Sequence, residues 1–110
     1  MNKIIELQAS HFNATCGVSL RPSHYDYVLR EQPPVSWFEV ISENFMGLGS
    51  ANGGRPISIL EKVRKNYPIV LHGVSLSIGS IDPPHINYLK KLKLLIHRIE
   101  PTRVSDHLCW

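Results

Sequence analysis

Residues 67–106 read YPIVLHGVSLSIGSIDPPHINYLKKLKLLIHRIEPTRVSD, and this stretch contains a strand, a helix and another strand in succession. Residues 69–72 are a short apolar run after a proline, which predicts a strand. Asp82 is followed by two prolines, a pattern that predicts a capped helix N-terminus. The apolar stripe expected on this helix is Ile86, Leu89, Leu92, Ile96 and Ile99. Pro101 ends the helix, and residues 103–106 predict the next strand.

Two similar units precede this stretch. Residues 14–20 predict a first strand, and residues 24–32 predict a helix that ends at two consecutive prolines. Residues 37–42 are rich in aromatic and β-branched side chains, which predicts a second strand leading into a Gly-rich loop at 47–54. Residues 1–13 show no sustained periodicity, so we expect a leading arm before a single domain that begins at residue 14.

A second helix is expected to begin near Pro56, because proline suits the first helical turn. Its predicted buried face consists of Ile57, Leu60, Val63 and Tyr67. Its predicted solvent face consists of Glu61, Lys62, Arg64 and Lys65.

The predicted strands at residues 37, 69 and 103 begin 32 and 34 residues apart, close to the length of a β-α-β unit. Successive units of this kind favour right-handed crossovers and parallel strands. The sequence therefore predicts an α/β fold, built either as a doubly wound sheet or as an eight-fold barrel. It contains no GxGxxG motif, so dinucleotide binding has no support.

The composition is that of a soluble globular protein, with 43% hydrophobic and 19% charged residues. The net charge of +3 owes much to one amphipathic segment, whose basic residues are Lys90, Lys91, Lys93 and Arg98. A solvated helix face explains these charges, so we expect no nucleic-acid partner. No apolar run is long enough to span a membrane, and Cys16 and Cys109 form no CxxC pair. With no signal-peptide pattern either, we expect a cytoplasmic protein.

Side chains that bind metals follow each predicted strand. They are His24 after the first strand, Glu43 after the second, His72 after the third, and Asp106 with His107 after the fourth. Because the carboxyl ends of adjacent parallel strands lie at the same edge of a sheet, we expect these side chains to converge on a metal site. Histidine and carboxylate without thiolate fit iron, manganese or zinc. Asn44 and Ser105 are interpreted as residues that orient the ligands.

Glu39 has the same strand parity as Glu43 and is predicted to point into a barrel interior, where its charge needs a partner. His85 and His97 fall on the third predicted helix, away from the strand ends. We interpret both as surface residues.

Four blocks of the sequence resemble the multinuclear non-haem iron-dependent oxidative enzymes. The blocks are GVSLRPSHY at 17–25, WFEVISENFM at 37–46, LHGVSLSIGS at 71–80 and VSDHLCW at 104–110. The resemblance implies a (β/α)8 TIM-type barrel that binds two or three irons, with residues 14–110 forming about the first four strands and three helices. It places Glu43, His72, Asp106 and His107 at ligand-bearing positions, with His24 as a further candidate.

The same resemblance implies an oxidative activity. Characterised members of the family use iron and dioxygen to modify cysteine residues of ribosomally made peptides, often with a partner protein that recognises the leader peptide. Such a barrel needs about 250 residues, so we expect the 110-residue chain to be inactive alone. Where many relatives have Ser-Glu-His-Leu, residues 105–108 read SDHL, whose aspartate reaches one methylene less far. The alternatives are a metal-dependent sugar isomerase or phosphodiesterase-like barrel, or a non-catalytic remnant.

Overall fold

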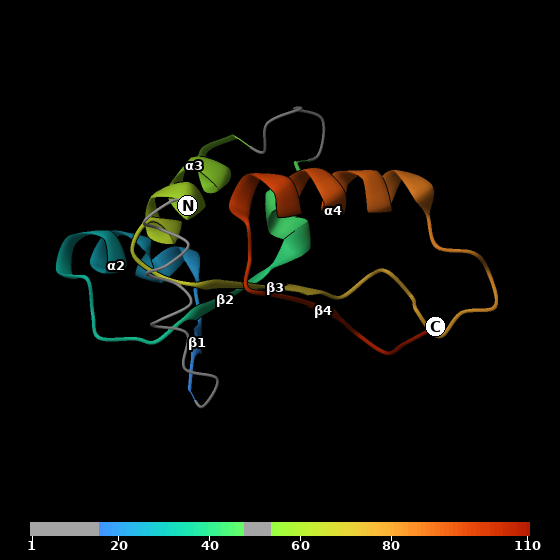
Figure 1. The fold of residues 1–110 in the computed structure, drawn as a ribbon, viewed down its shortest axis with the longest axis horizontal. Coiled ribbons are helices and arrows are strands. Elements are labelled where there is room, and N and C mark those ends of the chain that lie inside the picture. The colour runs from blue at the N-terminus through green and yellow to red at the C-terminus, as the bar shows by residue number, and fades with distance from the viewer. Residues whose placement is uncertain (1–15, 48–53) are drawn as a thin grey trace.

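The computed structural model describes residues 16–47 and 54–110, in which four strands form one parallel sheet (Figure 1). The strands are β1 (Val18–Ser19), β2 (Phe38–Ile41), β3 (Ile69–Gly73) and β4 (Arg103–Asp106). They lie side by side in the order β1-β2-β3-β4. The predicted α/β class is thus confirmed, and the strand order is that of consecutive strands in a (β/α)8 barrel. The expected leading arm lies outside the described residues.

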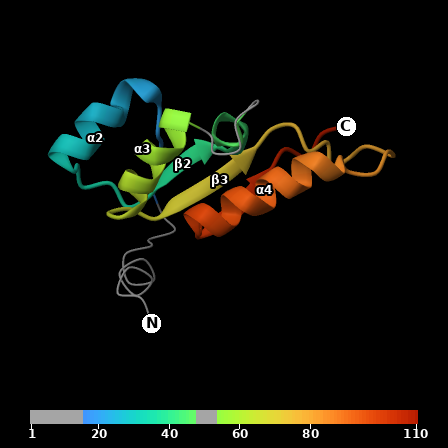
Figure 2. The same ribbon diagram turned by 90° about the horizontal axis from the view of Figure 1, so that it is seen from above.

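The helical elements connect successive strands, and α3 and α4 lie on the same face of the sheet (Figures 1 and 2). They are η1 (Pro22–His24), α2 (Tyr25–Glu31), η2 (Ser42–Phe45), α3 (Gly54–Arg64) and α4 (Ile86–Ile99). The chain leaves α2 through Gln32 in a left-handed conformation (φ 46°), directly before the predicted pair of prolines. In the described ranges, no helix has both the length and the apolar character to cross a bilayer.

The hydrophobic core lies between the sheet and these helices. Alternate residues of β2 and β3 face it because successive side chains of a strand point to opposite faces. The strand residues buried there are Phe38, Val40, Ile69 and Leu71. The predicted buried face of α3 is confirmed, and it continues into Tyr67, whose ring meets that of Phe38 edge to face at 4.9 Å.

The prediction that Arg64 stays in water is wrong. Its side chain is only 8% exposed, and Nε donates a hydrogen bond of 2.7 Å to the carbonyl oxygen of Ile99. Nη2 donates a second bond of 3.1 Å to the carbonyl oxygen of Glu100. These carbonyls end α4, where the backbone turns left-handed at Glu100 (φ 49°) and terminal acceptors need donors. Arg64 of α3 therefore caps the C-terminus of α4.

Replacing Arg64 with alanine should lower the free energy of unfolding by about 2–3 kcal/mol, because a buried carbonyl oxygen at Ile99 and a partly buried one at Glu100 would lose a charged donor. Urea unfolding monitored by circular dichroism would measure the change. Lys65→Ala is the matched control, because Lys65 is the exposed neighbour of Arg64. Equal midpoints for Arg64→Ala and the unmodified protein would contradict the capping role.

The predicted start of α4 is also wrong. Asp82 is not its N-cap: His85 holds that place with an extended backbone (φ −68°, ψ 111°), and the helix begins at Ile86. Each proline removes a backbone donor and disfavours helical geometry in the residue before it, so two in a row delay the helix. The buried face of α4 also differs from the predicted stripe. Ile86, which was predicted to be buried, is 61% exposed, whereas Leu95, which was not part of the predicted stripe, is buried.

Candidate functional site

Ligand-type residues lie at the carboxyl ends of β2, β3 and β4. Figure 2 shows the arrowheads of β2 and β3 pointing toward the edge where α4 begins. Glu43 lies in η2, immediately after β2. His72 is paired in register with Ser105, and Gly73 with Asp106, so these residues lie on adjacent strands at the same edge.

The Glu43 carboxylate has very different surroundings at its two oxygens. Oε1 accepts hydrogen bonds from the Tyr88 hydroxyl at 2.6 Å, the Val74 amide at 2.9 Å, and both the amide and the hydroxyl of Ser75, at 3.1 and 2.9 Å. Oε2 is buried and has no hydrogen-bond partner within residues 16–47 and 54–110. Oε1 therefore accepts several hydrogen bonds, while the buried Oε2 accepts none from these residues.

These hydrogen bonds lower the pKa of Glu43. Burial by itself would raise the pKa, but the donors from Tyr88, the Val74 amide and the Ser75 hydroxyl stabilise the carboxylate and lower the pKa to about 2. Burial, together with the carboxylate of Glu43, raises the pKa of Tyr88. At neutral pH, Glu43 is therefore ionised and Tyr88 is a protonated donor.

The low pKa of Glu43 should make stability pH-dependent in acid. Because the folded-state pKa of about 2 lies below the ordinary value of 4.5, this carboxylate contributes its full stabilisation above pH 4.5 and loses it as pH falls toward 2. Urea unfolding between these pH values should show the loss. Glu43→Gln, which cannot ionise, should lack this part of the profile, and identical profiles for both proteins would contradict the assignment.

Asp106 shares a neighbour with Glu43. The Tyr88 hydroxyl, which binds Glu43, also lies 3.4 Å from Asp106 Oδ2, and the Leu76 amide lies 3.4 Å from Oδ1. Position 73 leaves no room for a side chain, because a Cβ there would collide with Asp106 Oδ2. Gly73 therefore allows the aspartate to fold back against β3.

His72 has a different set of neighbours. Its Nδ1 is hydrogen-bonded to the Ser105 hydroxyl at 2.8 Å, and its ring centroid lies 4.8 Å from that of His107, tilted by 54°. His72 and Ser105 are also register partners on adjacent strands. A hydrogen bond at one ring nitrogen fixes the ring orientation and leaves Nε2 for another ligand.

The predicted ligands thus form two groups. Glu43 and Asp106 meet at Tyr88, and His72 pairs with His107. The division follows from the pleat, because the consecutive residues Ser105 and Asp106 point to opposite faces of β4. Among the residues that the structure describes, no three histidine, cysteine or carboxylate side chains are placed to hold one ion.

The two other predicted residues lie near the first two strands. His24 ends η1 and is exposed, with Nδ1 3.4 Å from the backbone nitrogen of Arg21. Asn44 is exposed in η2 and lines a hollow of about 110 Å³ between β1 and β2. Sequence reasoning missed Tyr88, although it follows a predicted N-terminus. In a β-α unit, the first turn of the helix lies near the carboxyl ends of the strands, and this position was the available signal.

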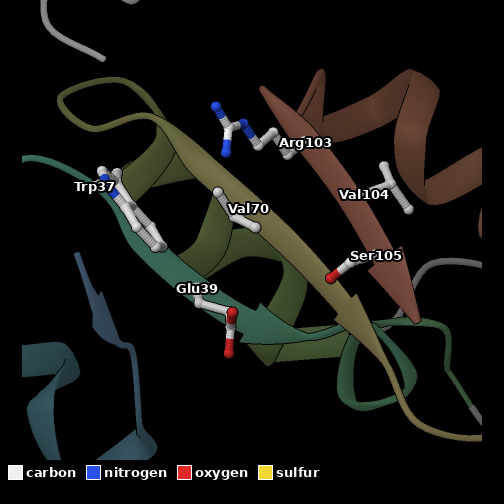
Figure 3. Close-up of a pocket in the computed structure, with 6 residues that line it drawn as sticks. All are labelled: Trp37, Glu39, Val70, Arg103, Val104 and Ser105. Carbon is white, nitrogen blue, oxygen red and sulfur yellow. The ribbon is translucent and has the colours of Figure 1, made fainter. Parts of the chain in front are cut away.

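The face of the sheet away from the helices forms an open hollow of about 440 Å³ (Figure 3). It is lined by Trp37, Glu39, Val70, Arg103, Val104 and Ser105. Glu39, Val70 and Arg103 occupy one register row across three strands, as the predicted inward direction of Glu39 requires. The Glu39 carboxylate and the Arg103 guanidinium therefore line the same hollow, on the amino-terminal side of the strand ends.

Comparison with known proteins identifies the family to which the chain is similar. Residues 15–110 match the family model described as "RiPP precursor modification enzyme MbnB/TglH/ChrH". The chain is 58% identical over 94 residues to a UPF0276 protein of Anaeromyxobacter sp., which covers 86% of the chain and 32% of the relative. A UPF0276 protein of Caulobacter vibrioides is 52% identical over 95 residues, with 86% and 32% covered.

More distant relatives match the same part. A UPF0276 protein of Vibrio vulnificus is 35% identical over 101 residues, covering 92% of the chain and 33% of the relative. The chain thus spans about a third of the length of the relatives that it matches. Since the family model covers nearly all of it, the chain belongs to the MbnB/TglH/ChrH family of RiPP precursor modification enzymes.

Proposed function

We propose that this chain is part of an iron-dependent enzyme that uses dioxygen to oxidise cysteine residues of a ribosomally made precursor peptide. The observation that carries the proposal is the family match over residues 15–110, whose description names precursor modification. The same match favours a peptide substrate over a sugar or a phosphodiester. Iron, cysteine and dioxygen are the finer parts of the proposal, and they follow from the resemblance of the strand-end motifs.

The side chains present fit the carboxylate part of a metal site. Glu43 is ionised and only partly buried, but its Oε2 atom is buried and has no hydrogen-bond partner among the described residues, which is costly unless a cation or a donor meets this atom. We propose Glu43, Asp106, His72 and His107 as iron ligands, with His24 as a further candidate. Since the relatives are about three times as long, later strands would supply the remaining ligands.

The residues of this chain would orient the site. The donors on Glu43 Oε1 fix the carboxylate, and the Ser105 hydroxyl fixes the ring of His72. Bound iron would supply a place for dioxygen and for the substrate thiolate. The hollow beside Ser105, with Glu39 and Arg103, lies on the face that a closed barrel would enclose. A partner protein that recognises the leader peptide completes the proposal.

The test requires the chain at the length of its relatives. This full-length form can be made by joining residues 15–110 to the remaining two thirds of the Anaeromyxobacter relative. We expect iron after anaerobic loading, and a mass change in a cysteine-containing peptide encoded beside the gene only when dioxygen is supplied. A protein that retains only zinc, or that turns over a sugar or phosphodiester without dioxygen, would refute the proposal.

A further inference from the structure

Tyr88 occupies a central position among the carboxylates of the site. It lies in the first turn of α4, and its hydroxyl is 2.6 Å from Glu43 Oε1 and 3.4 Å from Asp106 Oδ2. The side chain is only partly exposed, although most of its neighbours in the first turn are exposed. A single hydroxyl thus connects the end of β2 with the end of β4 through a helix.

The donors around Glu43 are not distributed as simple solvation of a carboxylate requires. Four donors point at Oε1, whereas the buried Oε2 receives none from the described residues. Buried polar atoms usually have a hydrogen-bond partner, so a buried carboxylate oxygen without one calls for an explanation. The unequal distribution of donors fixes the rotation of the Glu43 carboxylate and leaves the negatively charged Oε2 free of hydrogen bonds from the described residues.

We infer that Tyr88 is a positioning residue, which fixes the Glu43 carboxylate so that Oε2 is presented to a divalent cation. The inference rests on the proposed function and adds to it a residue outside the motif blocks. Tyr88 acts only through Glu43 and Asp106 and does not itself touch the ion. Its hydroxyl also lies beside Gly73, where an added Cβ would be 2.9 Å from the hydroxyl oxygen.

The test is Tyr88→Phe in the full-length form, which removes the hydroxyl and keeps the ring. Manganese(II) is the probe, because electron paramagnetic resonance measures the free ion without any need for activity. We expect manganese affinity to fall about tenfold, as it does when the partner of a metal ligand is removed. Tyr27→Phe is the matched control, because Tyr27 is a 54% exposed tyrosine on α2, and its affinity should equal that of the unmodified protein.

The outcomes separate this inference from the function on which it rests. Equal manganese affinity in Tyr88→Phe and the unmodified protein would overturn the positioning role and leave the function standing. No bound iron or manganese in the unmodified protein would refute both. A visible tyrosinate-to-iron(III) absorption band that disappears in Tyr88→Phe would also overturn the inference, because Tyr88 would then be a ligand.

If Tyr88→Phe lowers the melting temperature, a second variant tests whether the hydrogen bonds to Glu43 Oε1 control metal binding. Ser75→Ala removes another donor to Glu43 Oε1 and leaves α4 unchanged. Weaker manganese binding by this variant, at an unchanged melting temperature, would support the fixed rotation of Glu43. Unchanged binding would overturn it.

Discussion

His72→Ala and Glu43→Ala should each lower the iron content of the full-length form at least tenfold after identical anaerobic loading. Either substitution removes a proposed ligand and leaves its hydrogen-bond partners without their acceptor or donor: the Ser105 hydroxyl in one case, and the Tyr88 hydroxyl with two backbone amides in the other. Elemental analysis of the purified proteins measures the effect.

His97→Ala provides the control for this experiment, because His97 lies exposed in the last turn of α4 and should keep the full iron content. The melting temperature of each variant should be recorded as well. Similar iron loss in all three variants would indicate general instability, and the ligand assignment would have to be withdrawn.

Residues 1–110 expressed alone should associate rather than remain monomeric. In this chain β1 and β4 are the edges of the sheet, and parallel edges with free backbone groups pair with other strands. The apolar residues exposed on or beside these edge strands are Val18, Val104, Leu108 and Trp110, at 46%, 44%, 81% and 89%. Burying them against another copy would be favourable.

Size-exclusion chromatography with light scattering would show aggregates or dimers for residues 1–110, and a defined species for the full-length form. The isolated chain should also bind iron weakly, since the described residues do not place three ligands around one point. A monodisperse monomer that melts cooperatively and retains two irons would contradict this prediction.

The second and third strands were predictable because each is a short run of apolar, aromatic or β-branched residues, and the fourth was predictable from its place after Pro101. The first strand was predicted too long: among the described residues of the range 16–20, only Val18–Ser19 form a strand. The predicted fourth strand agrees with β4 residue for residue, and the second strand agrees with β2 to within one residue at each end. Solvent exposure was harder to predict. Arg64 has the polarity of a surface residue, and only the tertiary approach of the end of α4 reveals that its donors are needed inside.

The sequence predicted which histidines and carboxylates lie near the strand ends, but not how their side chains are arranged. Sequence position shows that Asp106 and His107 lie at the end of the fourth strand, but it does not show which way each side chain turns. In the structure, Asp106 meets Tyr88 on α4, whereas His107 meets His72. Tyr88 is neither a histidine nor a carboxylate and lies on a helix, so a search of strand ends for those residue types could not find it.

The hydrogen bonds to Glu43 have a consequence for folding. Its carboxylate connects η2 with Val74 and Ser75, 31 and 32 residues further along the chain, and with Tyr88, 45 residues further along. The turn η2, the loop after β3 and the first turn of α4 are therefore restrained together by hydrogen bonds to a single charged oxygen atom. The loop after β3 and the entry to α4 form one cooperative unit with the strand end that carries Glu43. Because the same ionised oxygen accepts all of these hydrogen bonds, protonation of Glu43 in acid should weaken the contacts of the loop after β3 and of the entry to α4 together.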